Sequence, residues 1–300
     1  MVKILDLCFQ DQPETIAAFL IETDEGPVLV ETGPHSTFPA LREGLRKFGY
    51  EPEDVRHVFL THIHLDHGGA AWAFAQHGAT IYLHPAGKPH FEHPEKLLES
   101  ARRIYKDDMD RLWGDLRPIP SERMVAVDHH KKIILGDVVF RALHTPGHAA
   151  HHIAWQLDHV LFVGDVAGVS IGEKGIVMPP CPPPDINIEV WLDSIQLIRN
   201  KRFRSFYLTH FGKVTAVKDH LLELEGRLRN WANWIKPYFN DGAQAAEVVP
   251  LFQDYVRKQL EAAGITGQEL LKYESANPSW MSVAGLMRYW KKKKESTGEV

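Results

Sequence analysis

A short run of histidines with an aspartate is the part of this sequence best suited to chemistry. Within residues 61–67 stand His62, His64, Asp66 and His67, and two glycines follow directly. The run comes after a short apolar stretch that we expect to form a buried strand, and a His-x-His pair on extended backbone places two imidazoles on the same side. Zn²⁺ and similar cations take this mixture of nitrogen and oxygen ligands. The run therefore predicts a metal site at the end of a strand.

Three more residues of the same chemical types stand behind later apolar stretches. They are His148 after Thr-Pro-Gly, Asp165 after Phe-Val-Gly, and His210 after Tyr-Leu-Thr. Any one of the three, taken alone, is also reasonably interpreted as an ordinary polar loop residue. Together with the first run they favour a site closed by the ends of several strands that are distant in sequence.

This ordered set of seven residues resembles the metallo-β-lactamase superfamily, in which strand-end loops of an αββα sandwich hold one or two metals. The resemblance covers residues 1 to about 215. It implies that a first metal is bound by one triad, a second metal by another, and that an aspartate bridges them. The first triad is His62, His64 and His148, the second is Asp66, His67 and His210, and the bridge is Asp165. We expect two divalent ions, zinc first, with manganese or iron as alternatives because His and Asp accept all three.

Two positions depart from the usual family pattern. Residues 31–33 read Glu-Thr-Gly where many members have Asp-Thr-Gly, so the carboxylate expected to orient a ligand is one methylene longer. After His148, His151 replaces a glycine, and His152 matches a second family histidine. We interpret His152 as a structural hydrogen-bonding residue rather than a ligand.

The function implied is hydrolysis by a hydroxide that bridges two metals, with no protein nucleophile. Asp66 is the catalytic residue we expect to orient this hydroxide and to carry its proton. A small ester, thioester or lactone is the favoured substrate. The alternatives are a small phosphodiester, or an oxygenase reaction at a single iron like that of persulfide dioxygenases. A non-catalytic binding module is disfavoured because none of the seven positions is lost.

The composition of the chain limits the kinds of binding partner and the cellular compartment that we expect. The formal net charge of −5 gives no general attraction to nucleic acid or to an anionic membrane surface. No stretch approaches the roughly 18 apolar residues of a membrane span, and no signal peptide is recognisable. The two cysteines, Cys8 and Cys181, lack metal-ligand spacing, which suits a reducing compartment. We therefore expect a cytoplasmic protein with a small-molecule substrate.

The elements needed to position the ligands follow from hydrophobic periodicity. Strands are expected near 2–9, 17–22, 27–31, 58–60 and 80–83, with helices at 38–48 and 69–75 between them. Strands near 125–127, 132–135, 138–143, 153–157 and 160–163 are expected to form a second sheet. The predicted fold is an α/β (α+β) class, four-layer αββα sandwich that occupies residues 1–214.

Two segments look added to this sandwich. An insertion at about 85–120 contains an expected helix at 95–113, with basic residues and two histidines that could face substrate or simply coat a surface helix. The residues in question are Lys88, His90, His93, Arg102, Arg103 and Lys106. Residues 215–300 form a helical extension rich in tryptophan. The extension could cap the site, pack on the sandwich or form a homodimer face.

A proline-rich segment at 177–186 separates Asp165 from a helix expected at 187–198. Five prolines in six positions hold such a segment extended, and Asp185 is expected to cap the helix. A rigid wall beside the metals and a mere spacer are both reasonable interpretations.

Overall fold

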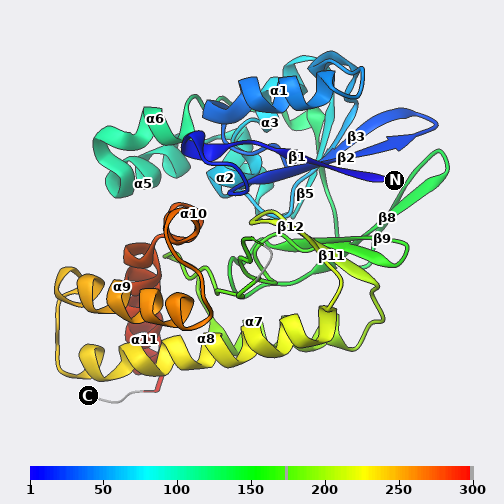
Figure 1. Cartoon of the computed structure of the whole chain (residues 1–300). Helices are drawn as coiled ribbons and strands as arrows, with labels where there is room; N and C mark the ends of the chain where they lie inside the picture. Colours follow the sequence, from blue (N-terminus) through cyan, green and yellow to red (C-terminus); the bar gives the residue numbers. More distant parts are fainter. Residues whose placement is uncertain (173–174, 298–300) are drawn as a thin grey trace.

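The computed structural model describes residues 1–172 and 175–297, which form two facing sheets with helices on both outer sides (Figure 1). The strands of the first sheet are β1 (Val2–Asp6), β2 (Ala17–Thr23), β3 (Gly26–Val30), β4 (His57–Phe59), β5 (Thr80–Leu83) and β6 (Met124–Ala126). Those of the second are β7 (Lys132–Leu135), β8 (Val138–His144), β9 (Ile153–Leu157), β10 (Val160–Phe162), β11 (Ser205–Leu208) and β12 (Gly212–Val214). The predicted four-layer sandwich is confirmed.

Parallel pairing brings the important strand ends to common edges. In the first sheet, β3 to β6 run parallel, so the segment after β4 opens at the same edge as those after β3 and β5. In the second sheet, β10 and β11 are the parallel pair. Because the carboxyl ends of parallel strands meet at one edge, the loops after β10 and β11 lie side by side.

Aromatic side chains fill the space between the two sheets. Phe59 of β4 stacks on Phe140 of β8 with ring centroids 4.2 Å apart, and Trp155 meets Phe59 edge-on at 4.9 Å. Trp155 also donates its indole N–H to the carbonyl of Leu60, at the start of the loop that carries the first histidines. This layer of the core therefore anchors the end of β4 against the second sheet.

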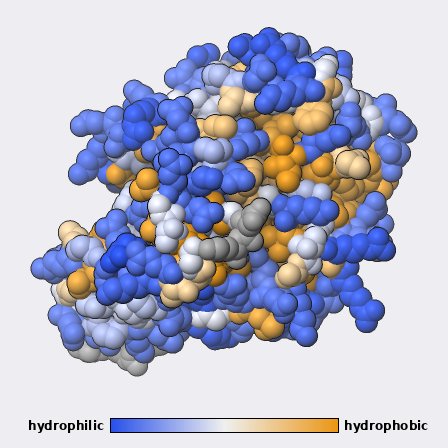
Figure 2. Space-filling view, viewed as in Figure 1, coloured by the Kyte–Doolittle hydropathy of each residue, from blue (hydrophilic) through white to orange (hydrophobic). Residues whose placement is uncertain are grey.

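The helices cover the outer faces of both sheets. On the first sheet lie α1 (Phe38–Arg46), α2 (Leu65–Gly68), α3 (Ala71–Gln76), α4 (Lys88–Glu92), α5 (Glu95–Tyr105) and α6 (Met109–Trp113). Beside the second sheet lie α7 (Ile188–Arg199) and α8 (Val217–Asn240), and α9 (Ala245–Ala262), α10 (Gln268–Ala276) and α11 (Ser279–Thr297) join the same hydrophobic core. Figure 2 shows mostly hydrophilic residues over the outer helices, with hydrophobic ones gathered between the upper and lower layers. In the described part of the chain, no helix is both long and apolar enough to cross a membrane.

Three local predictions were wrong. The strand expected near 125–127 is β6, and it pairs in parallel with β5 of the first sheet rather than joining the second. The helix expected at 95–113 is broken at Lys106, whose φ of 49° is incompatible with a continuing helix, into α5, a short 3₁₀ turn and α6. Asp185 does not cap α7, because the side chain of Asn187 accepts from the backbone N–H of Val190 instead.

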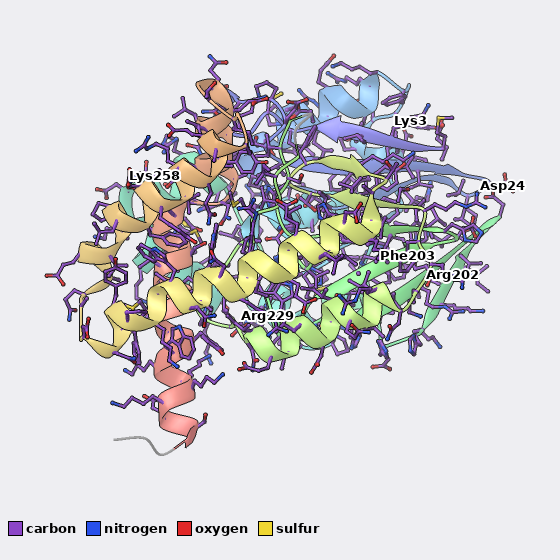
Figure 3. All side chains as sticks on the ribbon, turned by 60° about the horizontal axis from the view of Figure 1, so that its bottom comes forward. Lys3, Asp24, Arg202, Phe203, Arg229 and Lys258 are labelled. Atoms are coloured by element: carbon purple, nitrogen blue, oxygen red, sulfur yellow. The ribbon has the colours of Figure 1, made fainter. Side chains whose placement is uncertain are left out.

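The helices after residue 215 do not have a hydrophobic core of their own. Leu221, Leu224 and Leu228 of α8 are fully buried in one cluster with Trp191 of α7 and Phe206 of β11. Figure 3 looks onto this outer layer, where α8 runs over α7 and Arg229 lies on the exposed side. We propose the boundary at 214/215 as a change from sheet to helices within one shared core.

If the core is shared, Leu228→Ala will destabilise the whole chain and not only its helical end. Leu228 is 0% exposed, so the cavity left by truncation is expected to cost about 2–5 kcal/mol. Urea unfolding followed by far-UV circular dichroism and by tryptophan fluorescence should show one transition shifted as a unit. Leu222→Ala is the control, since Leu222 on the same helix is 46% exposed. Separate transitions, with only one of them shifted, would contradict the shared core.

Candidate metal centre

The seven residues singled out in the sequence converge at one edge of the sandwich. His62 and His64 lie in the loop after β4, and Asp66 and His67 in α2 directly behind it. The other three come from the loops that follow β8, β10 and β11: His148, Asp165 and His210. Five of the seven are buried, and His64 and Asp66 are partly exposed. Three overlapping groups among these seven have the spacing of metal ligands.

The first group is a triangle of imidazole nitrogens. His64 Nδ1 lies 2.9 Å from His62 Nε2 and 3.1 Å from His148 Nε2. Bonds of about 2.0–2.1 Å to a tetrahedral zinc place neighbouring nitrogens roughly 3.3 Å apart, so the triangle is close to that spacing.

The second group contains both kinds of ligand atom. Asp66 Oδ2 lies 3.4 Å from His210 Nε2 and 3.8 Å from His67 Nε2. The side chain of Asp66 keeps 23% of its surface exposed, whereas those of His67 and His210 are almost completely enclosed.

Asp165 stands between the two groups. Its Oδ2 is 3.4 Å from His148 Nε2 of the first group. Its Oδ1 is 3.2 Å from His67 Nε2 and 3.6 Å from His210 Nε2 of the second. One oxygen of this carboxylate thus faces each group.

Hydrogen bonds on the outer side of the rings determine which nitrogen of each histidine has a free lone pair. His148 donates from Nδ1 to the carbonyl of Pro180 (2.9 Å), and His210 donates from Nδ1 to the carbonyl of Thr15 (2.8 Å). Because a carbonyl only accepts, both rings carry a proton on Nδ1, so Nε2 is the nitrogen that can bind a metal ion. Thr15 and Pro180 act through the backbone, and no side-chain pattern in the sequence could have revealed them.

A hydrogen bond to Thr61 shows that His62 also carries a proton on Nδ1. Its hydroxyl is within hydrogen-bond reach of both the Glu31 carboxylate and His62 Nδ1. The hydroxyl has a single proton, and a carboxylate can only accept it, so Thr61 accepts from His62 Nδ1 in return. His62 Nε2 therefore also presents a lone pair to the first group.

This arrangement leaves buried atoms that a cation would satisfy. Among the described residues, His67 Nε2, Asp165 Oδ1 and His210 Nε2 are buried without a hydrogen-bond partner. Leaving buried polar groups without partners costs free energy. Neutral imidazoles with a shared carboxylate form the donor set of zinc, manganese or iron, so the residues fit a divalent metal.

The electrostatics of the two groups differ. Burial lowers the pKa of His62 well below its usual range, and His67 and His64 lower it further. Burial and the neighbouring His148 lower the pKa of His64 to about 4. Both rings are therefore neutral near pH 7, as metal ligands must be.

In the second group, the carboxylates have the larger effect on the pKa values of the histidines. Burial acts to lower the pKa of His67, but the charges of Asp165, Asp66 and Glu31 outweigh it and raise that pKa well above its usual range. Burial would raise the pKa of Asp66, yet His67 and His210 lower it to about 2. Asp66 is therefore ionised at neutral pH, and the negative potential of these carboxylates favours a cation between them.

Residues 31–33 contact His67 on the side that faces away from the cluster. The Glu31 carboxylate lies 3.2 Å from His67 Nδ1, while the backbone N–H groups of Thr32 and Gly33 both donate to the His67 carbonyl. Glu31 itself adopts a left-handed φ of 67°. The extra methylene relative to the usual aspartate is thus accommodated while the contact to His67 is kept.

His152 has the structural bonding pattern that we expected. Its Nδ1 pairs with the Thr145 hydroxyl at 2.8 Å, and its Nε2 accepts from the backbone N–H of Asp165 at 3.3 Å. Gly164 makes this approach feasible, because a Cβ there would lie 2.4 Å from Thr61 Oγ1 and 2.8 Å from His152 Nε2. Substitution of Gly164 would therefore push Asp165 out of place.

A cavity of about 570 Å³ opens onto the cluster, and His64, Asp66, Asp165 and His210 form its inner end. The proline-rich segment contributes Pro180 and Pro182 to Pro184, which favours the wall interpretation over the spacer. None of the basic residues or histidines suggested for substrate contact lines the cavity, although the structure describes all of them. These residues are Lys88, His90, His93, Arg102, Arg103 and Lys106, whereas the face of α5 that lines the cavity carries Leu97, Ala101 and Tyr105.

Comparison with known proteins agrees with this architecture. The family described as the Metallo-beta-lactamase superfamily matches residues 12–210. A metallo-β-lactamase fold-containing protein of Sulfurisphaera tokodaii is 27% identical over 179 residues, which cover 57% of this chain and 67% of that protein. An N-acyl homoserine lactonase of a Bacillus species is 29% identical over 157 residues, which cover 45% of this chain and only 54% of the lactonase.

Among solved structures, a metallo-β-lactamase family protein of Thermus thermophilus superposes with a TM-score of 0.71 at 20% identity. The superposition covers 97% of this chain and 93% of that one. The fold and site define a sandwich-type hydrolase with clusters of His and Asp that could hold divalent metal ions. The chain belongs to the metallo-β-lactamase superfamily.

Removal of the Glu31 carboxylate should weaken metal binding without touching a proposed ligand. Glu31→Ala leaves His67 Nδ1 without its acceptor, so the affinity for one metal should fall by about 10- to 100-fold. Glu31→Gln keeps an acceptor oxygen and should lose less. Competition with a chromophoric chelator measures both affinities, and Glu223→Gln on α8 is the control. Unchanged affinity in Glu31→Ala would show that His67 is oriented by other contacts.

Proposed function

We propose that this chain uses two divalent cations to hydrolyse a small carboxylic ester, thioester or lactone. The observation that carries the dinuclear part is the position of Asp165, one oxygen toward each group of nitrogens. In this proposal His62, His64 and His148 hold one ion, Asp66, His67 and His210 hold the other, and Asp165 is shared. Zinc is the proposed metal, because neutral imidazoles and carboxylates at this spacing suit it.

The bound ions would supply an activated water and polarise the carbonyl oxygen of the substrate. The protein's own residues then have two tasks. The outer partners, Glu31, Thr15 and Pro180, keep the ring nitrogens aimed inward. Asp66 borders the cavity with an ionised, partly exposed carboxylate, so it can accept a hydrogen bond from the attacking water and orient it toward the substrate.

Two observations support an acyl substrate over a phosphodiester. The chain resembles a protein named as an N-acyl homoserine lactonase, although the matched region spans about half of that protein. The acidic net charge of −5 also gives no general attraction for a nucleic-acid phosphate backbone.

A combined metal and substrate analysis tests this function. Protein purified without added metal and then loaded with zinc should contain about two equivalents per chain and cleave carboxylic esters, thioesters or lactones. Elemental analysis and a panel that also includes phosphodiesters give the answer. One equivalent of iron with thiol-dependent oxygen uptake would establish the oxygenase alternative, and cleavage of phosphodiesters alone would replace the acyl assignment.

Asp165→Asn is expected to reduce turnover by orders of magnitude while the fold remains intact. The amide is nearly isosteric, but it carries no charge to offset two cations and offers one good oxygen in place of two. One metal should be lost selectively. Metal content, melting temperature and rate are compared with the parent protein. Parental turnover with two metals still bound would show that Asp165 does not bridge them.

A further inference from the structure

Much of the cavity in front of the metal cluster is formed by the two segments added to the sandwich. One wall is formed by α5 and α6 of the insertion, and the opposite wall by α10 and the start of α11. Figure 1 shows these helices on the same side of the molecule, with α5 and α6 above α10. The elements that lie outside the sandwich therefore supply more than half of the residues that line this cavity.

The two walls meet through aromatic and thioether side chains. The Tyr105 hydroxyl of α5 contacts Met281 Sδ of α11 at 3.5 Å, and the Tyr105 ring lies 6.0 Å from that of Trp280. Tyr105 also packs edge-on against Trp113 at 4.9 Å. Aromatic and thioether groups adapt to apolar ligands and offer them large contact areas.

The charged groups on the walls already have partners. Among the described residues that line the cavity, Arg111 is the single Lys or Arg, and its guanidinium pairs with Asp108 at 2.9 Å. Glu274 accepts from the backbone N–H and the hydroxyl of Ser279. An anionic tail would thus find no uncommitted cation on these walls, and would meet the carboxylates of Asp108 and Glu274.

We propose that this cavity binds the uncharged, apolar acyl chain of the substrate, and that Leu97 and Met281 on its opposite walls determine which chain lengths are accepted. The proposal rests on the acyl hydrolysis proposed above and specifies its substrate class. A volume of about 570 Å³ lies within the roughly 300–1,000 Å³ typical of small-molecule sites, so it can hold a medium-length chain.

Burial of each methylene is worth roughly fourfold in binding. Across a series of acyl p-nitrophenyl esters from acetyl to decanoyl, kcat/KM of the zinc-loaded protein should therefore rise steeply with chain length. The rise should stop where the cavity is full. A decanoyl-length ester that ends in a carboxylate should be cleaved more slowly than its neutral counterpart.

Filling the cavity from either wall provides the decisive comparison. Met281→Trp and Leu97→Trp should each reduce kcat/KM for long esters by about tenfold or more while acetyl ester cleavage stays within about threefold. Met287→Trp and Leu98→Trp are the matched controls. Met287 lies on the same helix as Met281, and Leu98 is the neighbour of Leu97. Both control residues are partly buried, and neither lines the cavity.

Melting temperatures identify any variant that fails to fold. If one wall variant fails, the variant on the opposite wall and its control are compared instead. Equal losses for long and short esters in both wall variants, or equal losses in wall and control variants, would overturn the proposal. Faster cleavage of the carboxylate-tailed ester would overturn the assignment of an uncharged tail.

A separate binding measurement distinguishes failure of this proposal from failure of the proposed function. Decanamide is uncharged and resists hydrolysis, so its affinity can be measured by calorimetry whether or not any ester is cleaved. If no ester is cleaved but decanamide binds, and Met281→Trp weakens that binding about tenfold, the cavity assignment stands and the acyl hydrolysis falls. If decanamide binds no better than acetamide, the apolar cavity assignment is wrong.

Discussion

The structure depends most on how a buried carboxylate and several inward-facing imidazole nitrogens are held together. Asp165 has its two oxygens within 3.2–3.6 Å of nitrogens from three histidines, in surroundings from which water is largely excluded. Such a group is unfavourable without compensating cations, so the scaffold must force it into place. It does so through the parallel pair β10 and β11, whose ends bring Asp165 and His210 to one edge, and through Gly164, whose lack of a side chain lets its backbone lie close to Thr61 and His152.

Much of this arrangement could be predicted from the sequence, because its chemistry is local. A run of His, His, Asp and His after a buried strand is unusual enough to be recognised, and the later residues stand directly behind apolar strands of typical length. The hairpin at 135–138 likewise follows from a glycine and an aspartate between two β-rich segments, and β7 pairs with β8 in that register. The positions of strands and of chemically distinctive side chains are properties of short windows of sequence.

What could not be predicted depends on partners distant in the chain. The outer hydrogen bonds to His148 and His210 go to backbone carbonyls of Pro180 and Thr15, which no residue type identifies. The break at Lys106 is invisible to helical periodicity, and the periodicity alone does not say which face of α5 is turned to the cavity, a face that includes Tyr105 but neither Arg102 nor Arg103. The strand β6 satisfies the pattern for either sheet, and only its pairing with β5 resolves the choice.

The sandwich and the added helices contribute different parts of the proposed site, for a physical reason. The proposed ligands and their outer partners all precede residue 215, so the geometry of the cluster is set by bonds within the sandwich. The helices α8 to α11 share the core of the second sheet, and this shared core fixes where α10 and α11 stand relative to the cluster. Because these helices contribute none of the proposed ligands, the shape of their inner surface can change without altering the charges around Asp165. In the function proposed here, substrate selectivity and metal binding thus depend on different interactions, although one continuous core connects the residues that make them.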